Sequence, residues 1–558
     1  MRILPAGLAL AVVVTGCGKP RLALDPIPIQ DDDRYDIPQP KERLRDDYYD
    51  VLDYTIYTQI EQILDAPRNL RKLAGKPKQA LNVTPLDEIQ DSTWFENHIG
   101  IRDITPEEMR QGPNDPDGPD IRGPWIIVRA KTQGVTPGFT IEGPRGARYV
   151  IKFDPAAFPE LATGAEAIST RFLWAIGYHV PQNYIVHFDP GILEIGPKAK
   201  VRRGRKKRSM TRQDLDRVLA KVPRNADGTL RAIASRFISG TPLGPPPWAG
   251  RRKDDPNDVI PHEHRRELRA YRVFCSWLHH NDSREINAAD FYVEEEGRHF
   301  VKHYLIDFGA TLGSRSYEEN LRSEGFEYVI DFGEMTRSIA TAGLYERPWT
   351  RMEYPEIRGV GRFEAEHFDP GSWKPDYPNP AFENITARDG FWGAKIVMRF
   401  DDELIRKAVE AAEFTDPRAT DYVTEILIER RDRVVRYWFQ KVNPLDGFEA
   451  ATTPRGPVLR FEDLAVNHGL VEPRRYRVAI QSPDNGLVLF ETSQREIPLG
   501  NAVQALGSAQ PRELEKRLVR VFIRSSLPAS DQWTHEVKVT VYVEPSGRLR
   551  IAAIERDG

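Results

Sequence analysis

The stretch from 262 to 313 constrains the fold most, because a helix, a polar loop and a hairpin follow one another there. HEHRRELRAYRVFCSWLHH (262–280) predicts a helix, and FYVEEEGRHFVKHYLI (291–306) predicts a β-hairpin with Gly297 at its turn. Asp282 and Asn287 stand in the loop between them, and Asp307 follows the hairpin in IDFGATLG. Any fold for this chain must therefore place Asp307 at the end of a hairpin, and that hairpin must directly follow a polar loop.

A second set of elements precedes this stretch. The Gly/Pro/Asp-rich segment QGPNDPDGPDIRGP (111–124) predicts a domain boundary. After it we expect strands over 125–130, 138–143, 147–153, 183–188 and 230–238, with a helix over 164–176. Lys152 lies in the strand YVIKF, and Glu166 lies on the helix. Either residue alone is most simply a strand-edge lysine or a solvated helix glutamate, but inward-facing charges are costly unless they are paired.

Taken in order, these residues resemble the protein-kinase-like fold. That family has a His-x-Asp-x-x-x-x-Asn catalytic loop followed by Asp-Phe-Gly, and the HHNDSREIN segment (279–287) and Asp307 are similar to both. The Ser-Arg-Glu within the loop points away from eukaryotic-type Ser/Thr kinases and toward HipA-like, CotH-like and secretory-pathway kinases, while IDFGATLG is closer to phosphoinositide kinases. The predicted fold class is α+β, a two-lobed protein-kinase-like domain with an N-terminal helical extension and a C-terminal antiparallel β domain.

The resemblance implies a role for each of the five polar residues. Lys152 would contact the α- and β-phosphates of ATP, and Glu166 would pair with that lysine. Asn287 and Asp307 would hold Mg²⁺, since hard oxygen ligands suit a hard cation. Asp282 would accept the proton of an attacking hydroxyl, or orient it. The cofactors expected from the resemblance are thus ATP and Mg²⁺.

The phosphate-covering loop departs most from the family pattern. KTQGVTPGFT (131–140) offers backbone amides at Gly134, Thr136 and Gly138, but it is not a Gly-x-Gly-x-x-Gly motif. SRFISGTPLG (235–244) would be the last strand of the small lobe and the linker that contacts the adenine edge. We expect all of these to bind the nucleotide.

The second Asp-Phe-Gly triplet, in YVIDFGEM (328–335), has a different context. Asp331 does not follow the predicted hairpin and stands far from Asn287. We therefore expect Asp307, and not Asp331, to be the metal ligand.

The first seventeen residues predict a bacterial lipoprotein signal. Arg2 precedes an apolar run (3–14) that is too short to span a bilayer, and Val-Thr-Gly-Cys resembles a lipobox, in which Cys17 receives the lipid. The glycine after Cys17 favours the outer membrane, by resemblance to the sorting rule of enteric bacteria. A secretory signal with an accidental cysteine is the alternative. Cys275 is the only other cysteine, so an internal disulfide is impossible if Cys17 is lipidated, and we expect Cys275 to be a small core residue.

The remaining patterns give the domain plan. We expect a signal peptide (1–17), a Pro/Asp-rich flexible tether (18–45), a helical extension (46–124), a small lobe (125–244), a large lobe (245–445) and an antiparallel β domain (456–558). A formal net charge of −4 gives no global attraction to nucleic acid or to acidic lipid. The run PKAKVRRGRKKR (197–208) offers a local site, Lys198–Arg208, for an anionic partner, or else it is a solvated loop. His262 and His264 are expected to be structural.

Three functions agree with these patterns. The first is a membrane-anchored kinase-like phosphotransferase that moves the ATP γ-phosphate to a hydroxyl acceptor. The second is a catalytically silent kinase-like lipoprotein that binds a nucleotide or acts as a scaffold in the cell envelope, where ATP is scarce. The third is a surface lipoprotein whose C-terminal β domain serves adhesion or glycan binding.

Overall fold

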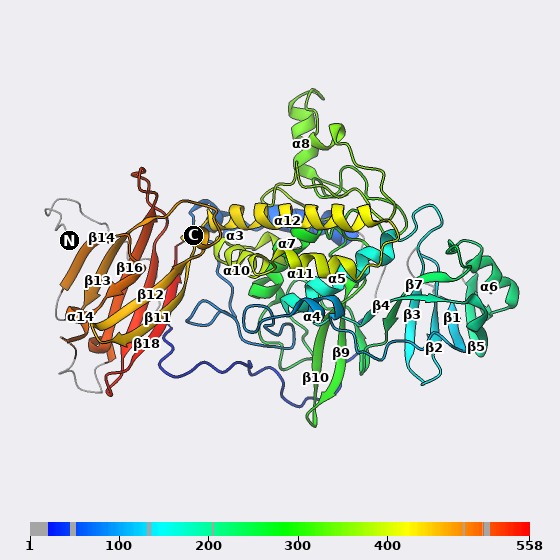
Figure 1. Cartoon of the computed structure of the whole chain (residues 1–558), viewed down its shortest axis with the longest axis horizontal. Coiled ribbons are helices and arrows are strands. Elements are labelled where there is room, and N and C mark those ends of the chain that lie inside the picture. Colours follow the sequence, from blue (N-terminus) through cyan, green and yellow to red (C-terminus); the bar gives the residue numbers. More distant parts are fainter. Residues whose placement is uncertain are drawn as a thin grey trace.

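The computed structural model describes residues 21–44, 52–130, 136–203, 206–483, 486–504, 506 and 514–557. A small lobe, a large lobe and a C-terminal β domain follow one another along the longest axis of the molecule (Figure 1). The large lobe, in green and yellow, lies between the other two.

The small lobe is built on a sheet with the strand order β4-β7-β3-β2-β1-β5-β6. Its strands are β1 (Trp125–Ala130), β2 (Gly138–Glu142), β3 (Arg148–Lys152), β4 (Asn183–Phe188), β5 (Leu193–Arg203), β6 (Lys206–Ser209) and β7 (Leu230–Arg236). Helix α5 (Leu161–Ile176) connects β3 to β4, and α6 (Arg212–Leu219) follows β6. Alternating residues of β1, Trp125 and Ile127, are fully buried, which is the pattern of a strand with one face on a core.

The basic run lies in this sheet and not in a loop, which corrects one of the two interpretations of Lys198–Arg208. β5 and β6 form an antiparallel hairpin in which Lys200 is opposite Ser209, and Ala199 and Met210 are buried beside that pair. Arg208 is bound to Asp214 of α6 at 2.6 and 2.7 Å. The apolar residues that flank the charges anchor the hairpin, while at least one of the charges already has a partner.

The large lobe contains the hairpin predicted from the sequence. β9 (Ala288–Glu295) pairs with β10 (Arg298–Leu305), and Gly297 adopts φ +74° at the turn, which a glycine reaches without strain. A third strand, β8 (Thr241–Gly244), joins β9, so the segment 237–240 links the two lobes and only part of 235–244 belongs to the small lobe.

Helices make up the rest of the large lobe. They are α7 (Arg266–Leu278), α8 (Phe332–Ala340), α9 (Pro380–Glu383), α10 (Ala387–Met398), α11 (Asp402–Glu410) and α12 (Pro417–Phe439). α10 and α12 pack closely because Gly390 faces Trp438, where a Cβ atom would lie 2.0 Å from the indole ring. Cys275 of α7 is buried and unbonded to another cysteine, so the prediction that it is a core residue is confirmed.

The N-terminal extension is less helical than expected. It has a π-helical turn at 53–57, then α2 (Thr58–Leu64), α3 (Ala66–Leu73) and α4 (Pro106–Gln111), with irregular chain between them. α4 begins at Pro106, where Thr105 and Glu108 form a capping box. The first residues of the expected extension, 46–51, lie outside the described residues.

The segment expected to be a flexible tether is docked along the protein over its described part, 21–44. The amide of Ala23 donates to Ala552, that of Ile37 to His299 and that of Arg43 to Leu243, at 2.7 to 2.9 Å. The Ile37 side chain is 5% exposed. Pro and Asp prevented regular secondary structure, as expected, but they did not prevent an extended chain from pairing with strand edges.

The C-terminal domain is an antiparallel β domain made of two sheets, and it begins at Leu445 instead of residue 456. The strands are β11 (Leu445–Thr453), β12 (Gly456–Asp463), β13 (Arg475–Ser482), β14 (Gly486–Thr492), β15 (Glu496–Pro498), β16 (Leu518–Ser526), β17 (Val537–Val543) and β18 (Leu549–Arg556). The sheet orders are β11-β12-β15 and β14-β13-β16-β17-β18, with short helices α13 (Leu464–Asn467) and α14 (Gly500–Gln504). The predicted fold class, two lobes with an N-terminal extension and a C-terminal β domain, is confirmed. No helix in the described part of the chain is long and apolar enough to cross a membrane.

Candidate active site between the two lobes

Lys152, Glu166 and Asp307 meet where the small lobe contacts the large lobe. The Nζ atom of Lys152, at the end of β3, lies 2.6 and 2.8 Å from the two carboxylate oxygens of Glu166 on α5. The same Nζ lies 2.9 Å from Oδ1 of Asp307. Burial opposes the charge on Lys152, but attraction from Asp307 and Glu166 outweighs it and raises the pKa of the lysine above its ordinary value. The structure thus joins three of the five predicted residues.

The apolar surroundings make this ion pair informative. Of the residues of α5, all but Trp174 are buried, and the Glu166 side chain is only 2% exposed. A buried carboxylate is stable only with a partner, and Lys152 supplies it. A lysine on the third strand that pairs with a glutamate on the following helix is the arrangement that positions ATP in protein kinases.

The backbone around Asp307 presents its side chain while it buries the next one. Asp307 has φ +63°, in the left-handed region that aspartate tolerates better than most residues, and its side chain is 49% exposed. Phe308 is fully buried in the core of the large lobe. Positive-φ residues are often found at functional sites, and this one turns a carboxylate toward the cleft.

Asn287 ties the polar loop to the strand that leads to Asp307. Its Nδ2 donates to the backbone oxygen of Asp282 at 2.5 Å, and its own carbonyl accepts from the amide of Ile306 at 2.8 Å. The first bond uses the amide nitrogen of the side chain and leaves the oxygen, the atom that ligates cations, for another partner. Asn287 and Asp307 together offer the oxygen donors expected for Mg²⁺, so these residues fit such an ion.

Asp282 is held by an arginine from the same loop. Its two carboxylate oxygens accept from Nε and Nη2 of Arg284, the second at 2.9 Å. The Arg284 guanidinium lies 5.2 Å from the ring centre of Tyr377. Burial lowers the pKa of Arg284, but the hydrogen bond and the attraction to Asp282 outweigh it, so the pKa is raised. The Asp282 side chain is partly buried, and both of its oxygens already accept hydrogen bonds from Arg284.

Two further carboxyl groups lie near Asp282 that sequence reasoning missed. Burial and then repulsion from Asp376 raise the pKa of Glu324 to about 8. Burial and then repulsion from Asp282 raise the pKa of Asp376 to about 7. Arg315 lies 2.9 Å from Glu324 and partly offsets this. No local pattern in the sequence indicates Glu324 and Asp376, since they approach Asp282 only through the fold. Arg284 stands in the same loop as Asp282, but the sequence does not predict the bond between them.

The predicted phosphate-binding residues are only partly placed. Gly134 lies outside the described residues, as does Cys17. Thr136 lines a recess of about 10 Å³ together with Lys152, Glu166 and Asp307. Gly138 stands opposite Lys152 across β2 and β3, and a Cβ there would lie 2.2 Å from the oxygen of Ile151. The close approach of β2 and β3 therefore requires glycine at position 138, and this requirement does not depend on nucleotide binding.

Asp331 and His262 make structural contacts, and for His262 a structural role was expected. Asp331 caps α8 by accepting from the amide of Glu334, and it pairs with Lys374 at 2.7 Å. His262 is fully buried between Asp258 and the backbone oxygen of Pro247. Among the described residues, no group of three or more His, Cys, Asp and Glu side chains is arranged to hold a metal ion. A kinase-type site does not need one, since an aspartate and an asparagine share the ion with the phosphates.

Comparisons with known proteins add little to this geometry. Neither a protein-family model nor a curated protein sequence matches the chain. The crystal structure of the Golgi casein kinase with Mn/ADP bound is similar at a TM-score of 0.28 and 9% identity, over 72% of this chain and 94% of that chain. Another crystal structure of the Golgi casein kinase gives 0.29 and 9%, over 74% and 96%. Scores of this size carry no argument about the class of this chain.

Proposed function

We propose that this chain is a kinase-like phosphotransferase that moves the γ-phosphate of ATP to a hydroxyl acceptor. The contact of Lys152 with both Glu166 and Asp307 carries the proposal. Neither a scaffold nor an adhesin requires a buried lysine–glutamate pair to be aimed at a half-exposed aspartate. The third function, adhesion through the β domain, has no such observation in its favour.

Each residue has a distinct task in the proposed reaction. Mg²⁺ bound with ATP would neutralise the charge that builds on the transferred phosphoryl group. Lys152, held by Glu166, would take the α- and β-phosphates, and Asp307 and Asn287 would hold the cation. Asp282 would accept or orient the proton of the attacking hydroxyl.

Nucleotide binding requires rearrangement of the cleft. The recess between Thr136, Lys152 and Asp307 has room for about one water molecule, whereas a ligand of nucleotide size needs several hundred Å³. Lys152 must also release Asp307 to a cation. We infer that the lobes separate, and that the phosphates then replace Asp307 as the second partner of Lys152.

A silent nucleotide-binding module is the second candidate, and the bond between Arg284 and Asp282 favours it. Both oxygens of Asp282 already accept a hydrogen bond from the guanidinium, so an acceptor hydroxyl must use the lone pairs that remain. A binding module makes no such demand on this carboxylate.

The variant Asp282→Asn separates the two candidates. Phosphate incorporation into the protein itself or into an envelope extract is compared between wild type and variant, with nucleotide affinity measured in parallel. In a phosphotransferase, incorporation falls by about 10²–10⁴ while ATP affinity is retained. Asp216→Asn, an exposed carboxylate on α6, is the matched control. Equal incorporation in wild type and Asp282→Asn contradicts the catalytic role, and ATP binding without incorporation in either supports the silent module.

We propose in addition that Cys17 is lipidated and anchors the chain in the cell envelope, at the outer membrane. The support is the lipobox-like sequence alone. Mass spectrometry of the mature N-terminus tests it: a lipid-modified Cys17 is expected, and an unmodified N-terminus at another residue contradicts it. The anionic partner at Lys198–Arg208 stays a prediction.

A further inference from the structure

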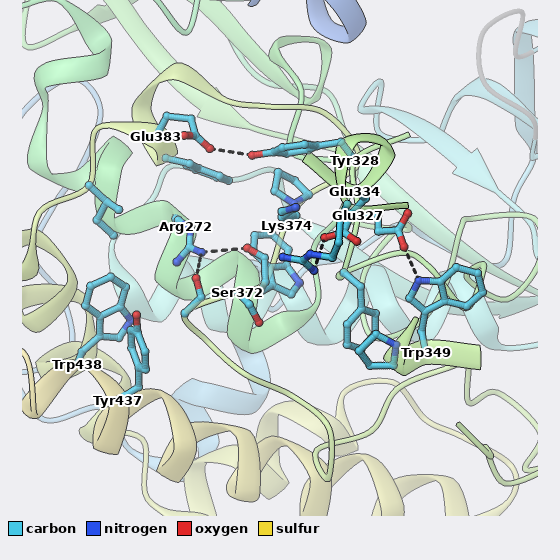
Figure 2. Close-up of a pocket in the computed structure, with 18 of the residues that line it drawn as sticks. Arg272, Glu327, Tyr328, Glu334, Trp349, Ser372, Lys374, Glu383, Tyr437 and Trp438 are labelled. Carbon is cyan, nitrogen blue, oxygen red and sulfur yellow. Dashed lines mark hydrogen bonds and ion pairs between the residues drawn. The ribbon is translucent and has the colours of Figure 1, made fainter. Parts of the chain in front are cut away.

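A pocket of about 540 Å³ opens in the large lobe, away from the residues of the phosphotransfer site. Its walls come from the segments 326–328 and 371–375, from α8 and from the end of α12. In Figure 2, Tyr437 and Trp438 lie on one side and Trp349 on the other, with Tyr328 and Glu383 above. The wall continues into the catalytic loop, because the amide of Asp376 donates to the oxygen of Asn281 at 3.0 Å.

Aromatic side chains with polar atoms make up a large part of the lining. They include Tyr328, Tyr345, Trp349, Trp373, Tyr437 and Trp438, whereas Ile385 is the one branched aliphatic residue among the described ones that line it. Pockets for acyl chains and other apolar ligands are lined mainly by apolar side chains with a few polar groups. Here charged residues are as prominent as rings, so the ligand must itself be polar.

The carboxylates of the pocket are already satisfied within its walls. Each has a hydrogen-bonded partner: the Trp349 indole for Glu327 at 2.7 Å, the Tyr328 hydroxyl for Glu383 at 2.7 Å and the Arg337 guanidinium for Glu334 at 2.9 Å. These bonds also fix the positions of the rings. The wall is preorganised, and its acidic groups do not call for a cationic ligand.

Two cations of the pocket are bonded in a different way. Lys72 donates to the backbone oxygen of Glu383 at 2.7 Å, and Arg272 donates to the backbone oxygens of Pro370, Gly371 and Trp373 at 2.9 to 3.1 Å. Burial is the main cause that lowers the pKa of both. Carbonyl groups satisfy hydrogen bonds but do not neutralise charge. The Glu383 carboxylate attracts both cations, but it also pairs with Arg68 at 3.3 Å, so one negative charge serves three positive ones. Lys72 and Arg272 therefore favour a further anionic group in the pocket.

Two other ligand classes fit less well. Cations of the protein already cover one face of several rings, with Lys374 5.4 Å from the centre of Tyr328 and Arg337 5.0 Å from that of Tyr345, which disfavours an ammonium ligand. An extended peptide needs free backbone groups to pair with, but the carbonyls of 370, 371 and 373 are taken by Arg272.

We propose that this pocket binds a saccharide that carries a carboxylate or phosphate group. The C–H faces of a sugar ring are apolar and pack on Tyr and Trp rings, while its hydroxyls need nearby polar groups. The acidic group lies at Lys72 and Arg272. The inference rests on the pocket and does not require the proposed phosphotransfer. It also places saccharide binding in the large lobe, and not in the β domain.

The test uses glucuronate, glucose 6-phosphate, neutral glucose and inorganic phosphate as probes against the whole soluble chain. Binding is followed by calorimetry and by tryptophan fluorescence, since three of the lining residues are tryptophans. Both acidic sugars are expected to bind more tightly than glucose, and Lys72→Ala is expected to weaken them about ten-fold, the loss of one charge-assisted hydrogen bond. Arg71→Ala, an adjacent exposed cation that does not line the pocket, is the matched control.

Trp349→Ala supplies the second variant and should weaken acidic and neutral sugars alike. Most of the Lys72 side chain is solvent-accessible and only its amino end is held, at the backbone oxygen of Glu383, so its replacement should leave folding intact and keeps the test valid if Trp349→Ala does not fold. Binding of only glucuronate points to uronic acids as the source, and binding of only the sugar phosphate points to phosphorylated sugars. Inorganic phosphate that binds as tightly as glucose 6-phosphate, or acidic sugars that bind Lys72→Ala and wild type equally, overturns the proposal.

Discussion

Replacing Glu166 with glutamine should raise the Mg²⁺ concentration that nucleotide binding requires. The Lys152 Nζ atom lies 2.6 and 2.8 Å from Glu166 and 2.9 Å from Asp307, so the two carboxylates share one cation. Glu166 is 2% exposed, and its attraction for Lys152 is little screened. A glutamine at this position keeps the shape but loses the charge, which leaves Asp307 with a stronger hold on Lys152.

The size of the effect follows from that competition. Two unit charges 2.9 Å apart attract by about 6 kcal/mol at an effective dielectric constant near 20, and hydrogen bonds to charged groups are worth about 1.5–3 kcal/mol net of hydration. Metal binding at Asp307 must displace Lys152, and that displacement is cheaper while Glu166 retains the lysine. We therefore expect the half-saturating Mg²⁺ concentration to rise about ten-fold or more in Glu166→Gln.

Calorimetric titration of an ATP analogue at a series of Mg²⁺ concentrations measures this shift. Glu142→Gln, which removes an exposed carboxylate of the same sheet, is the control, and circular dichroism confirms that each variant is folded. A Mg²⁺ requirement in Glu166→Gln equal to that of wild type would show that Lys152 and the cation do not compete for Asp307. The proposed exchange of partners would then be wrong.

Other predictions follow from contacts elsewhere. Asp307→Ala should abolish metal-dependent nucleotide binding in calorimetry, whereas Asp331→Ala should leave it within a few-fold. Asp331→Ala removes a helix cap and should lower the free energy of unfolding in urea by about 1–2 kcal/mol. If Asp331→Ala abolished nucleotide binding and Asp307→Ala did not, the assignment of the site would be contradicted. Asp87→Asn should lower the free energy of unfolding by about 3–5 kcal/mol, because this buried carboxylate pairs with arginines of α7, α10 and β18, and an unchanged urea midpoint would argue against it. Glu324 and Asp376, with pKa values raised from 4.5 and 3.8 to about 8 and 7, bind more protons folded than unfolded between these limits. The free energy of unfolding should therefore fall as pH rises from the ordinary carboxyl range toward about 7–8, and Glu324→Gln should flatten that slope in urea unfolding.

The sequence predicted the parts of the site that depend on local pattern. Lys152 and Glu166 were recognisable as charged residues in a largely apolar strand and helix, although neither was informative alone. The hairpin fixed which Asp-Phe-Gly triplet faces the cleft, because turn residues at Gly297 determine the pairing of the two strands. The contact of Lys152 with Glu166 and Asp307 was predicted from the order of motifs in the kinase-like family, and not from the residues alone.

Contacts between distant segments were beyond sequence reasoning. Composition indicated that 18–45 lacks regular structure, yet whether such a segment is free depends on partners, here the backbone groups of Leu243, His299 and Ala552. The raised pKa values of Glu324 and Asp376 have the same origin, because burial and repulsion arise only when the chain has folded. The aromatic pocket likewise draws on segments scattered from Lys72 to Trp438.

The docked segment 21–44 limits where the lobes lie if Cys17 carries the proposed lipid. Ala23 is six positions after Cys17, a span of about 20 Å at full extension, and it is bonded to Ala552 in β18. The β domain would therefore lie next to the membrane, with the large lobe beyond it and the small lobe farthest away (Figure 1). Fluorophores placed on exposed residues of β14 and α6, with a quencher in the lipid, measure this order. Stronger quenching at β14 than at α6 is expected, and equal quenching at both sites would mean that 21–44 detaches when the chain is anchored.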